Sequence, residues 1–131
     1  IAQPAGSRAR LGTTRGGCGM VSPSVGAVVL VRFPFSDLSA SKLRPAVVLA
    51  AVDRDDWILC QITSNPYADT RAVEIADSDF ASGNLMRTSY ARPGKLFSAN
   101  TSLMQRVAGS LTQAKVTAVV DAVVGLIRPK P

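Results

Sequence analysis

Short runs of apolar and β-branched residues, separated by polar segments, fill much of the chain, and this pattern is typical of buried β-strands. The runs predict strands at residues 27–33, 46–52, 57–62, 72–75, 89–92 and 95–98. The second and third runs flank a polar turn at 53–56 and therefore predict a β-hairpin. Because Pro93 and Gly94 interrupt the last two runs, we expect a bulge or a bend between them.

Two segments between these runs are predicted as loops. Residues 34–44 collect serine, lysine, aspartate and proline without periodicity, so we expect a surface loop there, with the next strand beginning just after Arg44. Pro45 fits this boundary, because proline can start a strand but is rare in the middle of one. Residues 79–84 form the second loop, in which Gly83 or Asn84 can take a positive φ.

The periodicity changes near the C-terminal end of the chain. Apolar residues recur there at the three-and-four spacing of one helix face, at Val116, Val119, Val120, Val123, Val124 and Ile127. Thr112 is a candidate N-cap residue, and Pro129 ends the helix. Because valine lowers helix propensity, packing must hold this helix. Five or six short strands and one terminal helix predict a mainly β protein with a small, partly closed antiparallel barrel.

The composition limits the size and the partners of this fold. The chain has 131 residues, 47% of them hydrophobic, which is enough for one domain with one core. We assign residues 1–22 to a leader outside the fold and residues 23–131 to the domain. The net charge is +6, but Arg8, Arg10 and Arg15 of the leader contribute half of it. Charge alone is therefore weak evidence for a nucleic-acid partner.

Several classes of chemistry are excluded by residue content. The chain has no histidine, so neither a Ser-His-Asp triad nor a histidine-based zinc site can form. Its two cysteines, Cys18 and Cys60, do not make a disulfide framework, which fits a reducing compartment. The longest apolar stretches, such as residues 46–52, are far shorter than the roughly 20 residues of a membrane helix. We therefore expect no membrane span.

The ordered motifs of the domain resemble one known family. GAVVLVRFPFSDL at residues 26–38 is followed by KLRPAVVL at 42–49, and then by QITS at 61–64. Asp79-Phe80, SYARPGKLF at 89–97 and GSL at 109–111 continue the match in the same order. Each motif alone is common, but together, over residues 26–127, they resemble the MazF/PemK-type toxins of type II toxin-antitoxin systems.

This resemblance implies both a fold and a function. The fold would be the SH3-like, partly open barrel of the MazF and CcdB toxins, assembled as a homodimer. The protein would act in the bacterial cytoplasm, where a cognate antitoxin masks its active groove. It would cut single-stranded RNA at a specific sequence, without a metal or other cofactor, and leave a 2′,3′-cyclic phosphate.

The same resemblance assigns roles to individual residues. Arg44 and Thr63 fall on the family's catalytic arginine and threonine, and Arg92 falls on a second arginine that some members use. A planar guanidinium suits the charge that develops on a phosphate during cleavage. The residues expected to bind RNA are Ser64, Arg92, Arg32, Lys42 and Ser89.

Two positions depart from the family pattern and leave the proton acceptor open. Ala27 stands where an aspartate is usual, and Gly94 stands where some relatives carry a carboxylate. Asp37 is a possible substitute base, although capping its own loop is the simpler role. Default interpretations also remain for the other site residues. Arg44 could be an ordinary solvated cation, and the Thr63 and Ser64 hydroxyls could bond the nearby backbone.

Two other functions therefore stay open. One is an RNA-binding or antitoxin-binding module that has lost its catalytic base, for which Ala27 and Gly94 are the evidence. The other is a CcdB-like toxin that poisons DNA gyrase by binding. That class uses an aromatic C-terminal tail, whereas this chain ends in Arg128-Pro-Lys-Pro131, which disfavours it.

Overall fold

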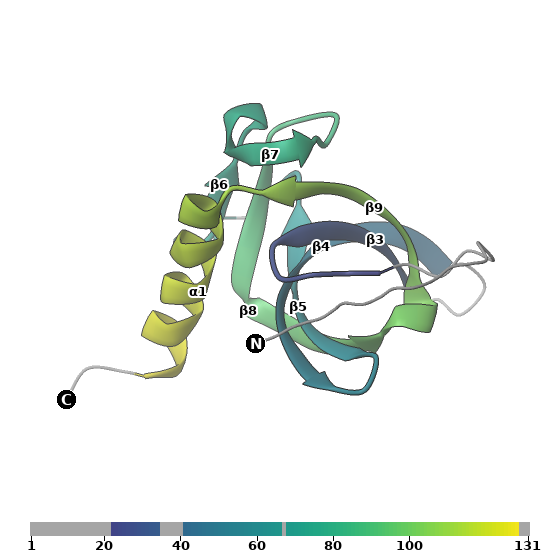
Figure 1. The fold of residues 1–131 in the computed structure, drawn as a ribbon. Helices are drawn as coiled ribbons and strands as arrows, with labels where there is room; N and C mark the ends of the chain where they lie inside the picture. The colour runs from purple at the N-terminus through teal and green to yellow at the C-terminus, as the bar shows by residue number, and fades with distance from the viewer. Residues whose placement is uncertain (1–21, 35–40, 67, 129–131) are drawn as a thin grey trace.

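The structure, a computed structural model, describes residues 22–34, 41–66 and 68–128. Its secondary structure is mostly β (Figure 1). The strands are β3 (Ala27–Pro34), β4 (Ser41–Asp53), β5 (Asp56–Thr63), β6 (Val73–Ile75), β7 (Phe80–Gly83), β8 (Ser89–Asn100) and β9 (Met104–Leu111). Two short 3-10 helices are η2 (Asp77–Asp79) and η3 (Thr101–Leu103), and the single α-helix of the described residues is α1 (Gln113–Ile127). None of the described helices has the length and apolar character needed to cross a membrane.

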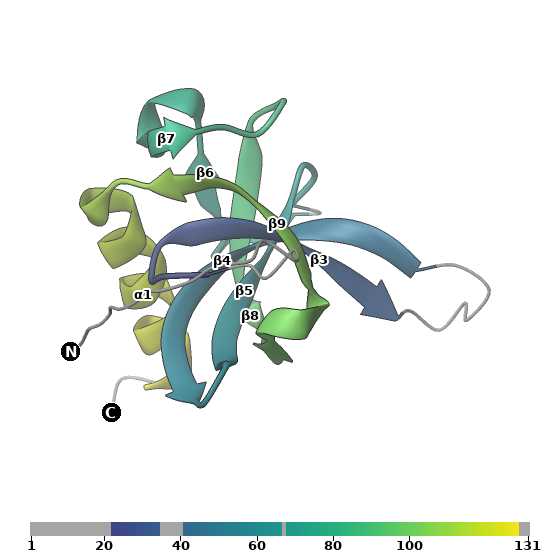
Figure 2. The ribbon, with the colours of Figure 1, turned by 45° about the vertical axis from the view of Figure 1, so that its right-hand side comes forward.

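All seven strands belong to one antiparallel sheet with the order β6-β8-β5-β4-β3-β9-β7. The sheet curls, so that β3, β4, β5 and β9 enclose most of a small barrel (Figures 1 and 2). Helix α1 packs outside the curl against β8 and β6. The predicted mainly β class, with a partly open barrel and a C-terminal helix, is confirmed.

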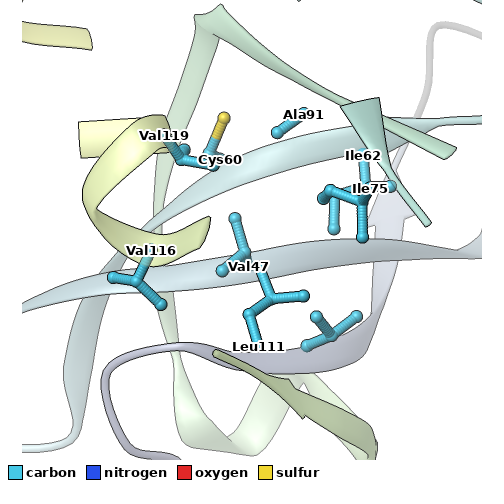
Figure 3. Packing of buried hydrophobic residues seen from close by; sticks show 9 residues of the cluster. Val47, Cys60, Ile62, Ile75, Ala91, Leu111, Val116 and Val119 are labelled. Atoms are coloured by element: carbon cyan, nitrogen blue, oxygen red, sulfur yellow. The ribbon is translucent and has the colours of Figure 1, made fainter. Parts of the chain in front are cut away.

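The strands bury side chains on both faces of the sheet, because successive residues of a strand point to opposite faces. One core cluster lies under α1 and is drawn in Figure 3; it consists of Val28, Val47, Cys60, Ile62, Ile75, Ala91, Leu111, Val116 and Val119. The other cluster lies on the opposite face and consists of Ala27, Val29, Val31, Ala46, Val48, Leu59, Ala99 and Met104. Burial on both faces explains why these strands read as continuous apolar runs.

Strand β4 begins earlier than the sequence predicts. Its first residues pair with β3, from Pro34 opposite Ser41 to Val31 opposite Arg44, so the predicted loop is wrong over residues 41–44. Pro45 lies inside the strand, but pairing with β5 starts only at the next residue. At Pro45 the strand therefore pairs with β3 only, and the missing N–H is tolerated there as at a sheet edge.

Two strands were not predicted at all. β9 alternates too weakly to stand out, and β7 lies inside the predicted loop 79–84. β7 pairs with β9, and glycine at position 83 allows the two backbones to approach closely: a Cβ added there would lie 2.3 Å from the carbonyl oxygen of Ala108. The positive φ expected at Gly83 or Asn84 occurs at Gly83, with φ +68°.

The bulge expected at Pro93 and Gly94 is confirmed. Strand β5 pairs with β8 at Cys60 opposite Leu96 and again at Ile62 opposite Ala91, so residues 92–95 of β8 face one residue of β5. Such an insertion bends the strand and redirects its side chains. The bulge lies where β8 carries Arg92, one of the predicted RNA-binding residues.

The predicted helix is confirmed, including its cap. The Thr112 side chain accepts a hydrogen bond from the Lys115 backbone N–H at 3.3 Å. Val116 and Val119, near the start of the helix, are buried, whereas Val124 and Ile127 are 44% and 66% exposed. The apolar face is therefore covered only along its first half in this chain.

Candidate functional site

A groove of about 230 Å³ opens where β4 begins, β5 ends and β8 begins. It is lined by Arg44, Pro45, Ile62, Thr63, Ser64, Leu85, Met86, Arg87 and Ser89. Four of the predicted site residues, Arg44, Thr63, Ser64 and Ser89, therefore come together although they span more than forty positions of the sequence.

Strand register explains why Arg44 and Thr63 meet. The β4–β5 pairing begins at Ala46 opposite Gln61. The same antiparallel register, continued by two residues, would set Arg44 opposite Thr63. Directly opposite residues share a face, with Cβ atoms about 5 Å apart. Thr63 in turn pairs with Tyr90 of β8. Both Arg44 and Thr63 line the groove at this end of the β4–β5 ladder.

The Thr63 hydroxyl is fixed by a local turn. It donates to the carbonyl oxygen of Asn65 and accepts from the Asn65 N–H, each at 3.1 Å, and the residue is 9% exposed. The hydroxyl therefore bonds the nearby backbone, as the alternative interpretation of Thr63 as a turn residue predicts. Its proton is available to a ligand only if the bond to the Asn65 carbonyl opens. Ser64 beside it is exposed.

The groove is positively charged. Among the described residues that line it, Arg44 and Arg87 carry guanidinium groups and none carries a carboxylate. Arg44 is half-buried and Arg87 is exposed. Cationic side chains beside apolar walls attract anions, and the planar guanidinium matches a phosphate group in particular.

Arg87 was missed by the sequence reasoning. Its backbone is anchored by Ser89, which is 4% exposed and whose hydroxyl donates to the Arg87 carbonyl oxygen at 3.0 Å. Leu85, two residues earlier, packs against the core cluster beneath α1. The available signal was a cation two residues before the SYARPGKLF motif, but nothing in the sequence placed it near Arg44.

Arg92 is not among the described residues that line the groove, and its guanidinium forms an ion pair with Asp69. Its Nε is 3.0 Å from Oδ2 of Asp69, and Oδ1 of Asp69 accepts from the Arg71 N–H at 2.9 Å. The hydrogen bond from Arg92, followed by that from Arg71, lowers the pKa of Asp69. This carboxylate therefore stays ionised at neutral pH and holds Arg92.

Cys60 ties the β8 bulge to the core. Its thiol donates to the Arg92 carbonyl oxygen at 3.1 Å. Burial raises the pKa of Cys60 to about 12, despite the opposing effect of this hydrogen bond. The thiol is therefore protonated at neutral pH, and a nucleophilic role for it is unfavourable.

Arg32, another predicted RNA-binding residue, is not among the described residues that line the groove. Val31 pairs with Arg44 and the next residue, Arg32, pairs with Leu43, so Arg32 lies on the opposite face of the ladder from Arg44. The side chain of Lys42 and the whole of Asp37 lie outside the described residues.

Ala27 and Gly94, the two positions that depart from the family pattern, differ in burial. Ala27 is 2% exposed within the second core cluster, where a small apolar residue packs well. Gly94 is exposed, and a Cβ added to it would lie 3.7 Å from Leu126 Cδ2, an ordinary van der Waals contact. A side chain at position 94 would therefore fit without strain. Within the described part of the chain, no three histidine, cysteine, aspartate or glutamate side chains gather as metal ligands.

Comparison with known proteins supplies the family. The sequence matches the family described as PemK-like, MazF-like toxin of type II toxin-antitoxin system over residues 24–127. The chain belongs to this toxin family. The predicted family is thereby confirmed. The groove lined by Arg44 and Thr63 therefore belongs to a protein of a type II toxin family. A search of curated proteins finds no match.

Solved structures share the fold of this toxin. An endoribonuclease from a mycobacterial species, solved in complex with its cognate antitoxin, superposes with a TM-score of 0.64 at 16% identity, covering 84% of this chain and 100% of that one. The toxin MazF-mt6 of Mycobacterium tuberculosis gives a TM-score of 0.62 at 15% identity, with 80% and 99% coverage. A chain of a MazE-MazF crystal structure from Deinococcus radiodurans gives a TM-score of 0.65 at 15% identity, with 82% and 98% coverage.

Proposed function

We propose that this toxin is an endoribonuclease that cuts single-stranded RNA in the groove beside Arg44, without a metal ion. The observation that carries the proposal is the meeting of Arg44, Thr63 and Ser64 in one groove whose described lining holds cations and no carboxylate. The names of the matched structures, which include endoribonucleases, support the same activity. The absence of histidine means that another group must move the protons.

The reaction that suits these residues uses the substrate's own nucleophile. The 2′-hydroxyl oxygen bonds to the adjacent phosphorus as the bond from phosphorus to the 5′-oxygen breaks. The products are a 2′,3′-cyclic phosphate and a 5′-hydroxyl end. One proton leaves the 2′-hydroxyl and one is delivered to the 5′-oxygen. Only RNA offers this nucleophile.

Arg44 would stabilise the negative charge that builds up on the phosphate oxygens. A guanidinium group can donate two parallel hydrogen bonds to these oxygens and stays charged at any working pH. A preorganised donor of this kind is worth about two to three orders of magnitude in rate. Ser64 would add a hydroxyl donor, and Thr63 would do so once its bond to Asn65 opens.

We also propose a setting for this activity. A cognate antitoxin would cover the groove in the bacterial cytoplasm, and two copies of the toxin would form a homodimer. The matched structures include toxins solved with their antitoxins, which supports the first part. An acidic or extended antitoxin segment would complement the groove's two arginines.

The experiment that tests the proposal compares cleavage of a long single-stranded RNA in EDTA by three proteins. These are the wild type, Arg44→Ala, and Arg54→Ala as the matched control, because Arg54 is an exposed arginine at the opposite end of β4. We expect Arg44→Ala to lower the single-turnover rate by about two to three orders of magnitude and Arg54→Ala to leave it within about twofold.

Two outcomes would overturn the proposal. Absence of cleavage by clean wild-type protein would favour a binding module without catalysis. Equal activity of the wild type and Arg44→Ala would mean that the groove is not the site of cleavage. Inhibition of DNA gyrase by the non-cleaving wild type would identify the CcdB-like alternative.

A further inference from the structure

We propose that Arg87 is a second phosphate-binding residue of the groove, which holds the phosphate of a nucleotide next to the cleaved linkage. This inference rests on the proposed function for the identity of the ligand. The position of Arg87 in the groove comes from the structure. Neither the family motifs nor the names of the matched structures assign a role to this residue.

Arg87 belongs to an anchored stretch of backbone. The buried Ser89 hydroxyl donates to its carbonyl oxygen, and Leu85 is held by the core cluster under α1. These two contacts fix the backbone on either side of the Arg87 side chain. A site on anchored backbone pays a smaller entropic cost when its ligand binds than a mobile loop does.

No described carboxylate neutralises the charge of Arg87. The ion pairs seen between described residues join Arg92 to Asp69 and Lys115 to Asp79. Arg92, in contrast, is held by Asp69 at 3.0 Å. Of the two arginines that stand near the start of β8, Arg87 is the one that lines the groove with its charge uncompensated.

The groove brings two cations together in a volume of about 230 Å³. Arg44 and Arg87 enter it from different segments, β4 and the connection before β8. Single-stranded RNA carries one phosphate per nucleotide, so two cations in one groove suit consecutive phosphates.

Met86 adds an apolar contact beside this second phosphate. It lines the groove and is 96% exposed, which is unusual for a methionine. A flexible thioether can adapt to the face of an unpaired base. The adjacent pair Met86 and Arg87 thus offers one apolar and one cationic group, which suits a nucleotide rather than a free phosphate ion.

The test measures binding without cleavage. The probe is a single-stranded 2′-O-methyl oligonucleotide of mixed sequence, which lacks the attacking hydroxyl. Its dissociation constant is measured over a salt series for the wild type, Arg87→Ala, Arg87→Lys and Arg54→Ala. Arg54 again serves as the matched control, because it is exposed and lies at the far end of β4.

We expect Arg87→Ala to bind about tenfold more weakly at low salt, the loss typical of one charge-assisted hydrogen bond. Its plot of log affinity against log salt should be shallower by about 0.7, which corresponds to one phosphate contact on a single strand. Arg87→Lys should keep the wild-type slope, and Arg54→Ala should keep both slope and affinity. A merely structural role for Arg87 would lower the melting temperature without changing the slope.

The outcomes separate this inference from the proposed function. If the wild type cuts RNA and Arg87→Ala has the same salt slope as Arg54→Ala, the inference is overturned and the proposed function stands. If Arg87→Ala lowers the slope but the wild type cuts no RNA, Arg87 binds phosphate in a protein that does not cleave. Wild-type protein that does not bind the oligonucleotide would overturn both.

Discussion

The two ends of the β4–β5 ladder each carry arginines, yet their surroundings differ. At the groove end, Arg44 and Arg87 line a cavity whose described walls hold no carboxylate. At the turn end, Arg54 stands among three aspartates of the tight turn, Asp53, Asp55 and Asp56. The described lining of the groove therefore holds only cations among its charged residues, whereas acids outnumber the arginine in the turn, although both ends belong to the same pair of strands.

The carboxylates of the turn are used by the fold. Asp53 Oδ1 accepts from the Arg54 N–H at 2.7 Å, and Asp56 Oδ1 accepts from Asn100 Nδ2 at 2.9 Å. Asp55 takes a positive φ of 61°, which aspartate tolerates in turns. The comparison shows that the local balance of charges, rather than the net charge of +6, distinguishes a candidate binding surface from a solvated turn.

The largest expected effect tests whether charge alone distinguishes the two ends. Arg44→Lys keeps the charge but loses the planar fork, so we expect the cleavage rate to fall by about one to two orders of magnitude. Arg54→Lys should leave the rate unchanged. Single-turnover cleavage of the same RNA checks both. A fully active Arg44→Lys would show that the groove needs only a point charge.

The smallest effect concerns the ion pair that holds Arg92. The folded state lowers the pKa of Asp69, so its contribution to stability is present above the unfolded pKa of about 3.9 and is lost as pH falls through the lower folded value. We therefore expect Asp69→Asn to be slightly less stable than the wild type at pH 7, with the difference shrinking below about pH 4. Urea unfolding at several pH values measures this. Asp121→Asn, an exposed change on α1, should show no such trend.

The sequence predicted the parts of the fold that rest on apolar patterns. The paired runs around the 53–56 turn, the bulge in β8 and the capped helix are all found. The start of β4 and the strands β7 and β9 were missed, because backbone pairing to neighbours distant in sequence forms them. Polar side chains on such strands leave no periodic signal.

The candidate site was predicted in part. Arg44, Thr63, Ser64 and Ser89 were named through family motifs and come together in the groove. Their roles toward RNA stay predictions. Two features had no sequence signal. One is the pairing of Arg92 with Asp69, 23 residues earlier in the chain, and the other is the approach of Arg87 to Arg44. Both depend on which strands become neighbours, which local patterns do not specify.

The measurement that tests the account most directly is the mapping of RNA product ends after incubation with the wild-type toxin in EDTA. Attack by the 2′-hydroxyl in the groove predicts a 2′,3′-cyclic phosphate on one fragment and a 5′-hydroxyl on the other, and no cut at a site carrying a 2′-deoxy nucleotide. A 3′-hydroxyl product, or cleavage at the 2′-deoxy site, would contradict it.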